Sequence, residues 1–443
     1  MSQNSMIVRL EHLYNQIKLI EKEIAGLKRL RDRLPVNRSY AINLQVAFDH
    51  AINELINEKI GLEELEIENP PSDIIEDVLS VDMATASRIR VDREAVEIEP
   101  TAGEKNLISF LEEIPKTEIH LHMEACISRD TLAGMLDNHE VPYDIADLDK
   151  LYKFTNLQEF IKLFLYIIDS IKNPSDFELI FKNLASYCNA NKVRYAEVFL
   201  APSRMIQNGL DFKEIAQTLD RLARESRLSG GPDIRYLIDV SRTFGVENAS
   251  RNLQYVLASK VNSIIGIGLG GAELMGPARD YKEVFAQALA EGLHAVAHAG
   301  EDDGPWSVRD TVEILRAERI GHGTSAIQDP ELMEILRDRG VPIEICLTSN
   351  IFTGKYVRRE QDHPVRRYYD QGLVCTINTD DPEIFNVNIS QEYYKFYKYL
   401  DFSVSEIVDL VRQGVYASFH SNPAELWHKY KSEIETLRKK YRV

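Results

Sequence analysis

The sequence has few cysteines and no long apolar run. Its four cysteines (Cys126, Cys188, Cys346 and Cys375) form no C-x-x-C pair, which argues against a disulfide framework and against a cysteine zinc site. No stretch approaches the roughly 20 uninterrupted apolar residues of a membrane span. The first residues also lack the apolar core and the cleavage site of a signal peptide, so we expect a cytoplasmic protein.

The chain also lacks an excess of positive charge. It has 52 Lys and Arg against 70 Asp and Glu, which gives a formal net charge of −18. Nucleic-acid-binding proteins gain affinity by neutralising phosphates with a basic surface. We therefore expect a small, neutral substrate, and neither a nucleic acid nor a membrane as partner. With 443 residues, the chain can form one large domain plus an accessory segment.

Residues 1–65 show a helical period. Apolar residues from Leu10 to Leu27 alternate steps of three and four, and Pro35 ends this helix before a second one at about 40–60. The two helices are predicted to form a hairpin, followed by a linker or wrapping arm at 66–110. A narrow apolar seam between charged residues is typical of a helix that packs on another helix. The hairpin can therefore mediate homo-oligomer contacts or pack on its own barrel.

From residue 111 onward, short apolar runs alternate with amphipathic segments, which is typical of parallel βαβ units. The runs predicted as strands are Thr117–Glu124, Val193–Ala201, Asp233–Ser241, Ser263–Gly271, His294–Gly300, Arg319–Gly323, Pro342–Asn350 and Val374–Asp381. Helices are expected between most of them, for example at Glu247–Val261, Tyr281–Glu291, Val308–Ala317 and Pro330–Arg339. We therefore predict an α/β fold, a (β/α)₈ TIM barrel over 111–443, with its chemistry at the carboxyl ends of the strands.

Histidines and carboxylates cluster at these strand ends. His120 and His122 lie two apart on a strand, so both side chains point the same way and can bind one ion. By itself this pair fits two hydrogen-bonded histidines equally well. Further strands end in His298-Ala299-Gly300-Glu301, Gly321-His322-Gly323 and Thr379-Asp380-Asp381-Pro382. Because all of them fall at the same mouth of the predicted barrel, they indicate a metal site.

The motifs PKTEIHLHME, HAGE, RIGHGT and INTDDPEIF resemble those of the adenosine deaminase family, and the likeness extends over roughly Ile114 to Phe419. The resemblance implies one Zn²⁺ per chain, with a water completing its shell. The implied ligands are His120, His122, His298 and Asp380. Zinc lowers the pKa of a bound water toward about 7, which supplies hydroxide for attack on C6 of a purine.

The same resemblance implies roles for the remaining motif residues. His322 and Asp381 are expected to orient and deprotonate the water, and Asp381 to contact N7 of the purine. Glu301 is expected to protonate N1, a role that requires a raised pKa. Gly271 is expected to donate its N–H to N3, since a residue without a side chain permits close approach, with Glu273 in a supporting role.

The implied reaction is the hydrolytic deamination of adenosine, and of 2′-deoxyadenosine, to inosine and ammonia. Adenosine-specific members usually carry Asp-Gly after the two histidines, where this chain has Glu124-Ala125. Glu is familiar there in relatives that act on adenine or aminodeoxyfutalosine, which are therefore alternative substrates. A 5′-phosphorylated adenosine or N6-methyladenosine is another, with Lys162, Arg204 and Arg242 as candidate phosphate donors.

Two other patterns have competing interpretations. Leu157, Phe160 and Phe164 resemble a hydrophobic gate over a nucleoside pocket, but their spacing also fits a helical core stripe. The segment Gly266–Gly271 matches a G-x-G-x-x-G dinucleotide fingerprint without the acidic residue expected about 20 residues later. A noncatalytic binding or assembly protein on the same barrel is a minor alternative, and the intact set of metal ligands, acid and base argues against it.

Overall fold

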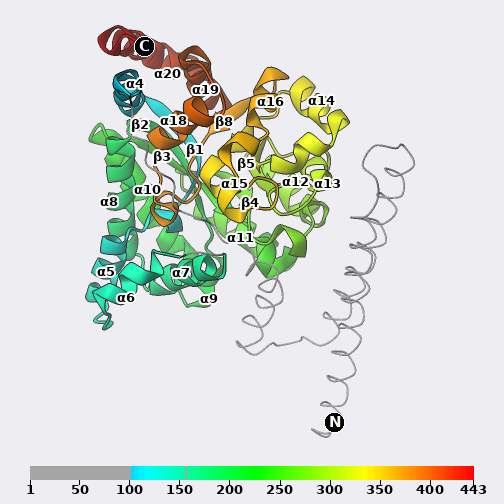
Figure 1. Ribbon diagram of the computed structural model, residues 1–443. Coiled ribbons are helices and arrows are strands. Elements are labelled where there is room, and N and C mark those ends of the chain that lie inside the picture. Colours follow the sequence, from blue (N-terminus) through cyan, green and yellow to red (C-terminus); the bar gives the residue numbers. More distant parts are fainter. Residues whose placement is uncertain (1–100, 155–156) are drawn as a thin grey trace, which may run out of the picture. The chain divides into compact units, whose positions relative to one another are not determined.

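The computed structural model describes residues 101–154 and 157–443, drawn in colour in Figure 1. The predicted hairpin at 1–65, most of the predicted arm at 66–110 and the proposed oligomer contact lie outside the described residues. The end of the predicted arm is not a linker but part of helix α4 (Ala102–Glu113). Its capping box, in which Thr101 and Glu104 bond each other's backbone N–H, explains why a helix begins there.

Eight parallel strands form one sheet in the order in which they occur in the chain. They are β1 (Lys116–His122), β2 (Val193–Leu200), β3 (Asp233–Asp239), β4 (Ile264–Leu269), β5 (His294–Ala299), β6 (Arg319–His322), β7 (Ile343–Ile345) and β8 (Cys375–Ile377). The sheet closes where Leu121 pairs with Asp380, just beyond β8. There the N–H of His122 donates to Asp380 O at 3.0 Å and the N–H of Asp380 donates to His120 O at 3.1 Å. The fold is the predicted (β/α)₈ barrel.

Helices surround these strands (Figure 1). Those before the last barrel strand are α5 (Arg129–Asn138), α6 (Ile145–Leu151), α7 (Leu157–Ser170), α8 (Asp176–Ala190), α9 (Ser203–Gln207), α10 (Phe212–Leu228), α11 (Gly245–Ser259), α12 (Lys282–Ala290), α13 (Pro305–Asp310), α14 (Pro330–Arg339), α15 (Leu347–Thr353) and α16 (Val365–Asp370). After β8 come α17 (Pro382–Phe385), α18 (Ile389–Tyr399), α19 (Val404–Ala417) and α20 (Pro423–Tyr441). Among the helices of the described part, none is long and apolar enough to cross a membrane.

Local signals explain where helices begin and end. Helix α14 has the predicted bounds, because Asp329 caps its first N–H groups, Pro330 occupies its first turn and Gly340 follows in the left-handed conformation. The helix predicted at Val308–Ala317 is instead α13, continued by a π-helical turn at Thr311–Leu315. Asp211 caps the first turn of helix α10 by accepting the N–H of Lys213. The helix buries one apolar face, which includes Ile215 and Leu219.

The predicted strand Pro342–Asn350 is wrong in its second half. Strand β7 ends at Ile345, and the chain then forms helix α15. The buried carboxylate of Glu392, on α18, accepts the backbone N–H of Thr348 at 3.2 Å and also its hydroxyl. Glu392 thus supplies an acceptor for an N–H of the first turn of α15. The local sequence, which predicts a strand here, does not reveal this distant acceptor.

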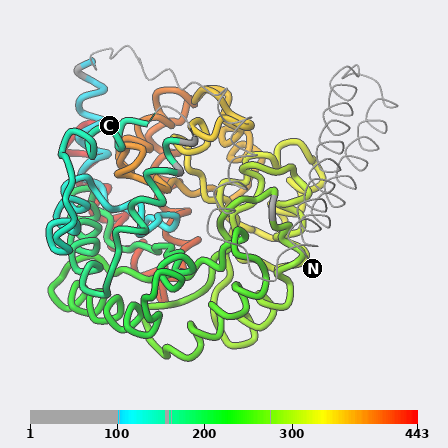
Figure 2. The backbone as a smooth tube through the Cα atoms, turned by 90° about the horizontal axis from the view of Figure 1, so that it is seen from below, coloured from blue at the N-terminus to red at the C-terminus, as the bar shows by residue number. Residues whose placement is uncertain are grey.

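Helix α20 covers the amino end of β1. The hydroxyl of its buried Tyr430 donates to Lys116 O at 2.9 Å. Helix α4 packs against both α18 and α20, so the first and last helices of the described part lie side by side in Figures 1 and 2. The carboxyl ends of the strands lie at the other end of the barrel, where the polar motifs are.

Candidate metal centre and active site

Three histidines and one aspartate converge at the carboxyl end of the barrel. His120 and His122 project from β1, His298 from β5, and Asp380 follows β8. Their candidate ligand atoms all lie within 4.8 Å of one another. His122 Nε2 is 3.2 Å from His298 Nε2, and Asp380 Oδ1 is 3.2 Å from His122 Nε2 and 3.4 Å from His120 Nε2. The four ligands predicted from the sequence are therefore brought together in space.

The chemistry of this set fits a zinc ion. His120 Nδ1 lies 2.7 Å from Glu344 Oε2, and an imidazole N–H donated to this carboxylate leaves the Nε2 lone pair directed toward Asp380. Among the described residues, His120 Nε2 is buried without a hydrogen-bond partner. A cation bound between that lone pair and the carboxylate would remove their repulsion. Imidazoles with one carboxylate are ligands that zinc accepts.

A series of buried charged side chains continues from His120 through Glu344 to Arg319 and Glu197. Arg319 on β6 lies 2.5 Å from Glu344 of β7 and 2.6 Å from Glu197 of β2, and all three side chains are fully buried or nearly so. Burial tends to raise the pKa of Glu344, but Arg319 and His120 outweigh this effect and lower it. Our sequence prediction omitted these residues. The available signal was a charged residue inside an otherwise apolar predicted strand.

Glu301 lies just after β5, in a loop organised by Glu273. The Glu273 carboxylate accepts the backbone N–H groups of Gly300, Glu301, Asp302 and Asp303 at 2.6–3.1 Å. Glu301 Oε2 is thereby placed 3.3 Å from His322 Nε2. Burial raises the pKa of Glu301 well above its ordinary value, and the nearby Asp302 and Asp380 add to this effect. Glu301 is therefore more readily protonated than an ordinary carboxylate.

His322 and Asp381 flank the ligand cluster. His322, at the end of β6, and the ligand Asp380 both have positive φ angles, of 64° and 67°. Such backbone strain in residues other than glycine is concentrated at functional sites. His322 Nε2 is 3.9 Å from Asp380 Oδ2. Burial and the neighbouring Asp380 raise the pKa of Asp381 to about 8, and its Oδ1 has no partner among the described residues.

Glu124 and Gly271 occupy different strand ends of the same mouth. Glu124 begins the short helix η1 (Glu124–Cys126) rather than ending the predicted strand. Its buried Oε1 accepts the N–H of Ala201 at 2.8 Å, whereas its Oε2 has no partner in the described part of the chain. Gly271 has a φ of 87°, and a Cβ there would lie 2.7 Å from Ser241 Oγ. Glycine is required at this position.

Asp239, at the end of β3, is a buried carboxylate that our sequence prediction did not include. Its Oδ1 has no hydrogen-bond partner among the described residues. Burial raises its pKa to about 6, although the nearby His122 and His120 oppose this shift. A Cβ on Gly268, in β4, or on Gly270, just after it, would collide with the Asp239 carboxylate, so these two glycines make room for it. An acidic residue at the carboxyl end of a predicted barrel strand was the signal that could have identified it.

Phe160 and Phe164 lie half-buried on α7, which contacts η1. The Phe160 ring stacks on Phe385 with centroids 5.6 Å apart and also contacts Phe164 and Phe352. The side chain of Leu157, the third predicted gate residue, lies outside the described residues. These rings therefore form an aromatic cluster between α7 and the helices that follow β7 and β8.

Two of the candidate phosphate donors are engaged within the protein. Arg204 makes two bonds of 2.6 Å to the Asp169 carboxylate. Arg242 is buried and donates to His298 O at 2.6 Å and Gly276 O at 2.5 Å. Lys162 is exposed on α7. Both arginines stabilise the barrel mouth through these contacts.

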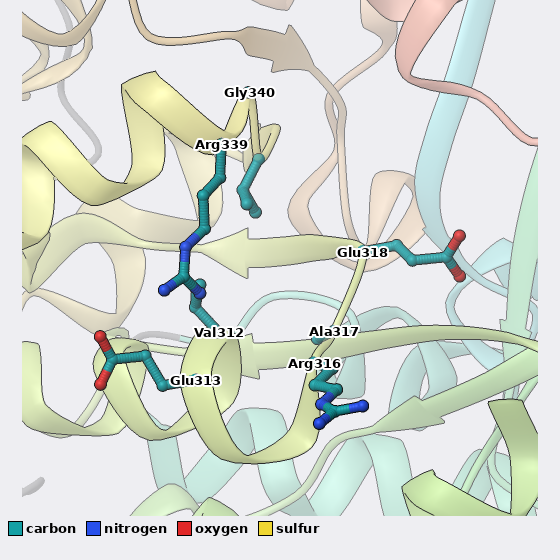
Figure 3. A pocket seen from close by; sticks show the side chains of 8 residues that line it. Val312, Glu313, Arg316, Ala317, Glu318, Arg339 and Gly340 are labelled. Atoms are coloured by element: carbon teal, nitrogen blue, oxygen red, sulfur yellow. The ribbon is translucent and has the colours of Figure 1, made fainter.

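A separate pocket, shown in Figure 3, lies at the other end of the barrel. It is lined by residues that precede β6 and β7, namely Val312, Glu313, Arg316, Ala317, Glu318, Arg339, Gly340 and Val341. Because the strands are parallel, these residues lie at the amino ends, away from the histidine cluster. Its mixed acidic and basic lining includes none of the predicted site residues.

The parallel barrel, with histidines and carboxylates gathered at the carboxyl ends of its strands, defines a hydrolase of the metal-dependent TIM-barrel class. The family model of adenosine deaminase matches residues 115–435. The chain belongs to the adenosine deaminase family, as its motifs predicted.

Curated relatives with different substrates resemble this chain. It is 34% identical to an aminodeoxyfutalosine deaminase of Streptomyces avermitilis, over 71% of this chain and 89% of the relative. It is 31% identical to an adenine deaminase of Streptomyces coelicolor, over 73% of this chain and 96% of the relative. Identity to an adenosine deaminase of Clostridium kluyveri is 27%, over 75% and 98% of the two chains.

Solved structures share the fold. The adenine deaminase of Arthrobacter aurescens superposes with a TM-score of 0.68 at 25% identity, over 74% of this chain and all of that one. A zinc-bound amidohydrolase from Burkholderia ambifaria gives a TM-score of 0.72 at 21% identity, over 81% and 99% of the two chains. The second likeness concerns the fold alone.

Proposed function

We propose that this protein hydrolyses the 6-amino group of an unphosphorylated adenine derivative and releases ammonia. The observation that carries the proposal is the cluster of His120, His122, His298 and Asp380, with the acid Glu301 beside it. Aminodeoxyfutalosine is the first substrate to test, because the relative at 34% identity is named as a deaminase of this compound. In addition, Glu124 stands where adenosine-specific members usually have an aspartate. Adenine and adenosine follow.

In the proposed mechanism, the four clustered side chains would hold a zinc ion, which when bound would supply a water of lowered pKa. Glu301, with its raised pKa, donates a proton to N1 of the purine, which makes C6 electrophilic. Asp381 accepts a proton from the attacking water, and His322 orients that water. The oxygen adds to C6. As the C6–N bond breaks, Asp381 passes its proton to the amino group, which leaves as ammonia, and the remaining hydroxyl proton returns Glu301 to its acid form.

Charge at the mouth supports an unphosphorylated substrate. Glu124 and Asp239 are both buried. Burial is the main cause of the raised pKa of Glu124, and the nearby Asp239 adds to it. Their unpaired oxygens can accept hydrogen bonds from hydroxyl or N–H groups. A phosphate would instead meet like charge, and Arg204 and Arg242 are already bonded within the protein.

The experiment is a screen of purified, zinc-loaded protein against aminodeoxyfutalosine, adenosine, 2′-deoxyadenosine, adenine and N6-methyl-AMP. Ammonia release and the loss of adenine-like absorbance are measured for each. We expect turnover of at least one unphosphorylated compound, with kcat/KM highest for aminodeoxyfutalosine. A clear preference for N6-methyl-AMP would overturn the proposed substrate class, and no turnover of any compound would overturn the deaminase assignment.

A further inference from the structure

The side chain of His322 ends a series of hydrogen bonds that begins at a backbone amide. The N–H of Val365 lies 3.1 Å from His363 Nδ1. A backbone N–H can only donate, so His363 Nδ1 must accept, and the proton of the neutral ring is on Nε2. Burial, with His322 nearby, lowers the pKa of His363 to about 3, which agrees with a neutral ring.

This proton position determines the orientation of the next side chain. His363 Nε2 lies 3.1 Å from Asn350 Oδ1, to which it donates. The other end of the amide, Asn350 Nδ2, therefore faces His322 Nδ1 at 2.9 Å and donates to it. Since Nδ1 of His322 accepts this bond, a neutral His322 carries its proton on Nε2.

The Nε2 atom of His322 points into the site. It lies 3.3 Å from Glu301 Oε2 and 3.9 Å from Asp380 Oδ2. The exposed fractions of His322, Asn350 and His363 are 1%, 2% and 3%, so water cannot readily replace a lost bond in the series. An amide or imidazole turned the wrong way would leave a buried donor or acceptor unpaired, at a cost of about 1–3 kcal/mol.

We propose that Asn350 and His363 are positioning residues that hold His322 with its proton on Nε2, so that it donates a hydrogen bond toward the reacting oxygen. This inference rests on the proposed function and sharpens it. An Nε2 that already carries a proton cannot take one from water. Of the two residues expected to deprotonate the water, His322 therefore stabilises and orients it, and Asp381 is left as the base.

The direct test is ¹⁵N NMR of the zinc-loaded protein labelled at histidine, with the His322 signals assigned by their loss in His322→Gln. We expect an unprotonated Nδ1 and a protonated Nε2 in His322. In Asn350→Asp, the new carboxylate accepts from the ring, so Nδ1 should become protonated. A wild-type His322 protonated on Nδ1, or an Nδ1 signal unchanged in Asn350→Asp, would overturn the proposal. These readouts need no substrate, so they are independent of whether the deaminase assignment holds.

Kinetics provide a second test. Loss of the fixed donor in His363→Phe should lower kcat by about 10²-fold with little change in KM, as for removal of other donors in a reaction centre. His363→Gln offers an amide N–H to Asn350 and should recover most of that loss. The control for changing a buried polar side chain away from this series is Asn252→Asp, which should leave kcat unchanged. Asn252 lies on α11, is buried, and donates to Ser203 Oγ at 2.8 Å. Equal kcat in His363→Phe, His363→Gln and the wild type, with zinc retained, would contradict the positioning role.

Discussion

The two ends of the barrel differ in how their buried charged groups are paired. At the amino end, Lys116 donates to two carbonyl oxygens at 3.0 Å, and Arg319 lies between Glu197 and Glu344. At the carboxyl end, the described residues leave oxygens or nitrogens of His120, Glu124, Asp239 and Asp381 without partners. An unpaired buried polar group costs about 1–3 kcal/mol. The carboxyl end is therefore the part of the barrel where a bound metal and substrate would supply the missing partners.

The largest expected effect is on zinc binding, and it should differ between two histidines of the same strand, β5. His298→Ala should abolish stoichiometric zinc binding, because it removes a ligand of the cluster. His294 lies at the amino end of the same strand, stacked on Phe419, so His294→Ala should retain zinc. Metal analysis after dialysis distinguishes the variants. If both keep one zinc per chain, His298 is not a ligand.

Glu301→Gln should lower turnover by about 10²–10⁴-fold while zinc content and folding stay intact, because the amide cannot donate the proton that N1 needs. The raised pKa of Glu301 also predicts that wild-type activity declines as pH rises through that pKa, where the acid form is lost. Steady-state kinetics across pH measures both effects. Near-normal turnover in the variant would remove Glu301 from the mechanism.

At the amino end, Arg319→Met should act on stability. It leaves Glu197 and Glu344 buried without their cation, which costs about 3–5 kcal/mol. Arg194→Met is the control, because the side chains of Arg194 and its partner Glu433 are 48% and 36% exposed, and solvent-exposed pairs contribute about 0–1 kcal/mol. Denaturant unfolding of the zinc-loaded proteins gives both values. Equal unfolding free energies would show that the buried charges are not coupled as described.

The smallest expected effect is that of Lys116 on how the free energy of unfolding changes with pH. Burial lowers the pKa of Lys116 from 10.5 to about 7, so the unfolded chain binds more protons than the folded chain between these pH values. Stability should therefore rise with pH in this window, by at most about 1.4 kcal/mol per pH unit from this group. Lys116→Met should flatten the slope even if it lowers the absolute stability. A slope equal to that of the wild type would show that Lys116 is charged when folded.

The sequence predicted the carboxyl end better than the amino end. Its histidine and carboxylate motifs are short and follow apolar strands, so the barrel and the cluster around His120 could be predicted together. Glu197, Arg319 and Glu344 form ion pairs only because strands that are distant in the sequence meet in the barrel. No local sequence pattern predicts this pairing. The same reason explains why α15 was missed: the acceptor for its first turn, Glu392, comes from a helix 44 residues further along the chain.

A metal titration tests most directly whether the carboxyl end of the barrel becomes a deaminase when it binds one zinc ion. Zinc is added in steps to metal-free protein, and ammonia release from aminodeoxyfutalosine and from adenosine is measured at each step. Activity should rise linearly and stop rising at one zinc per chain. A well-folded protein that binds no zinc, or that binds it and releases no ammonia from either compound, would contradict this expectation.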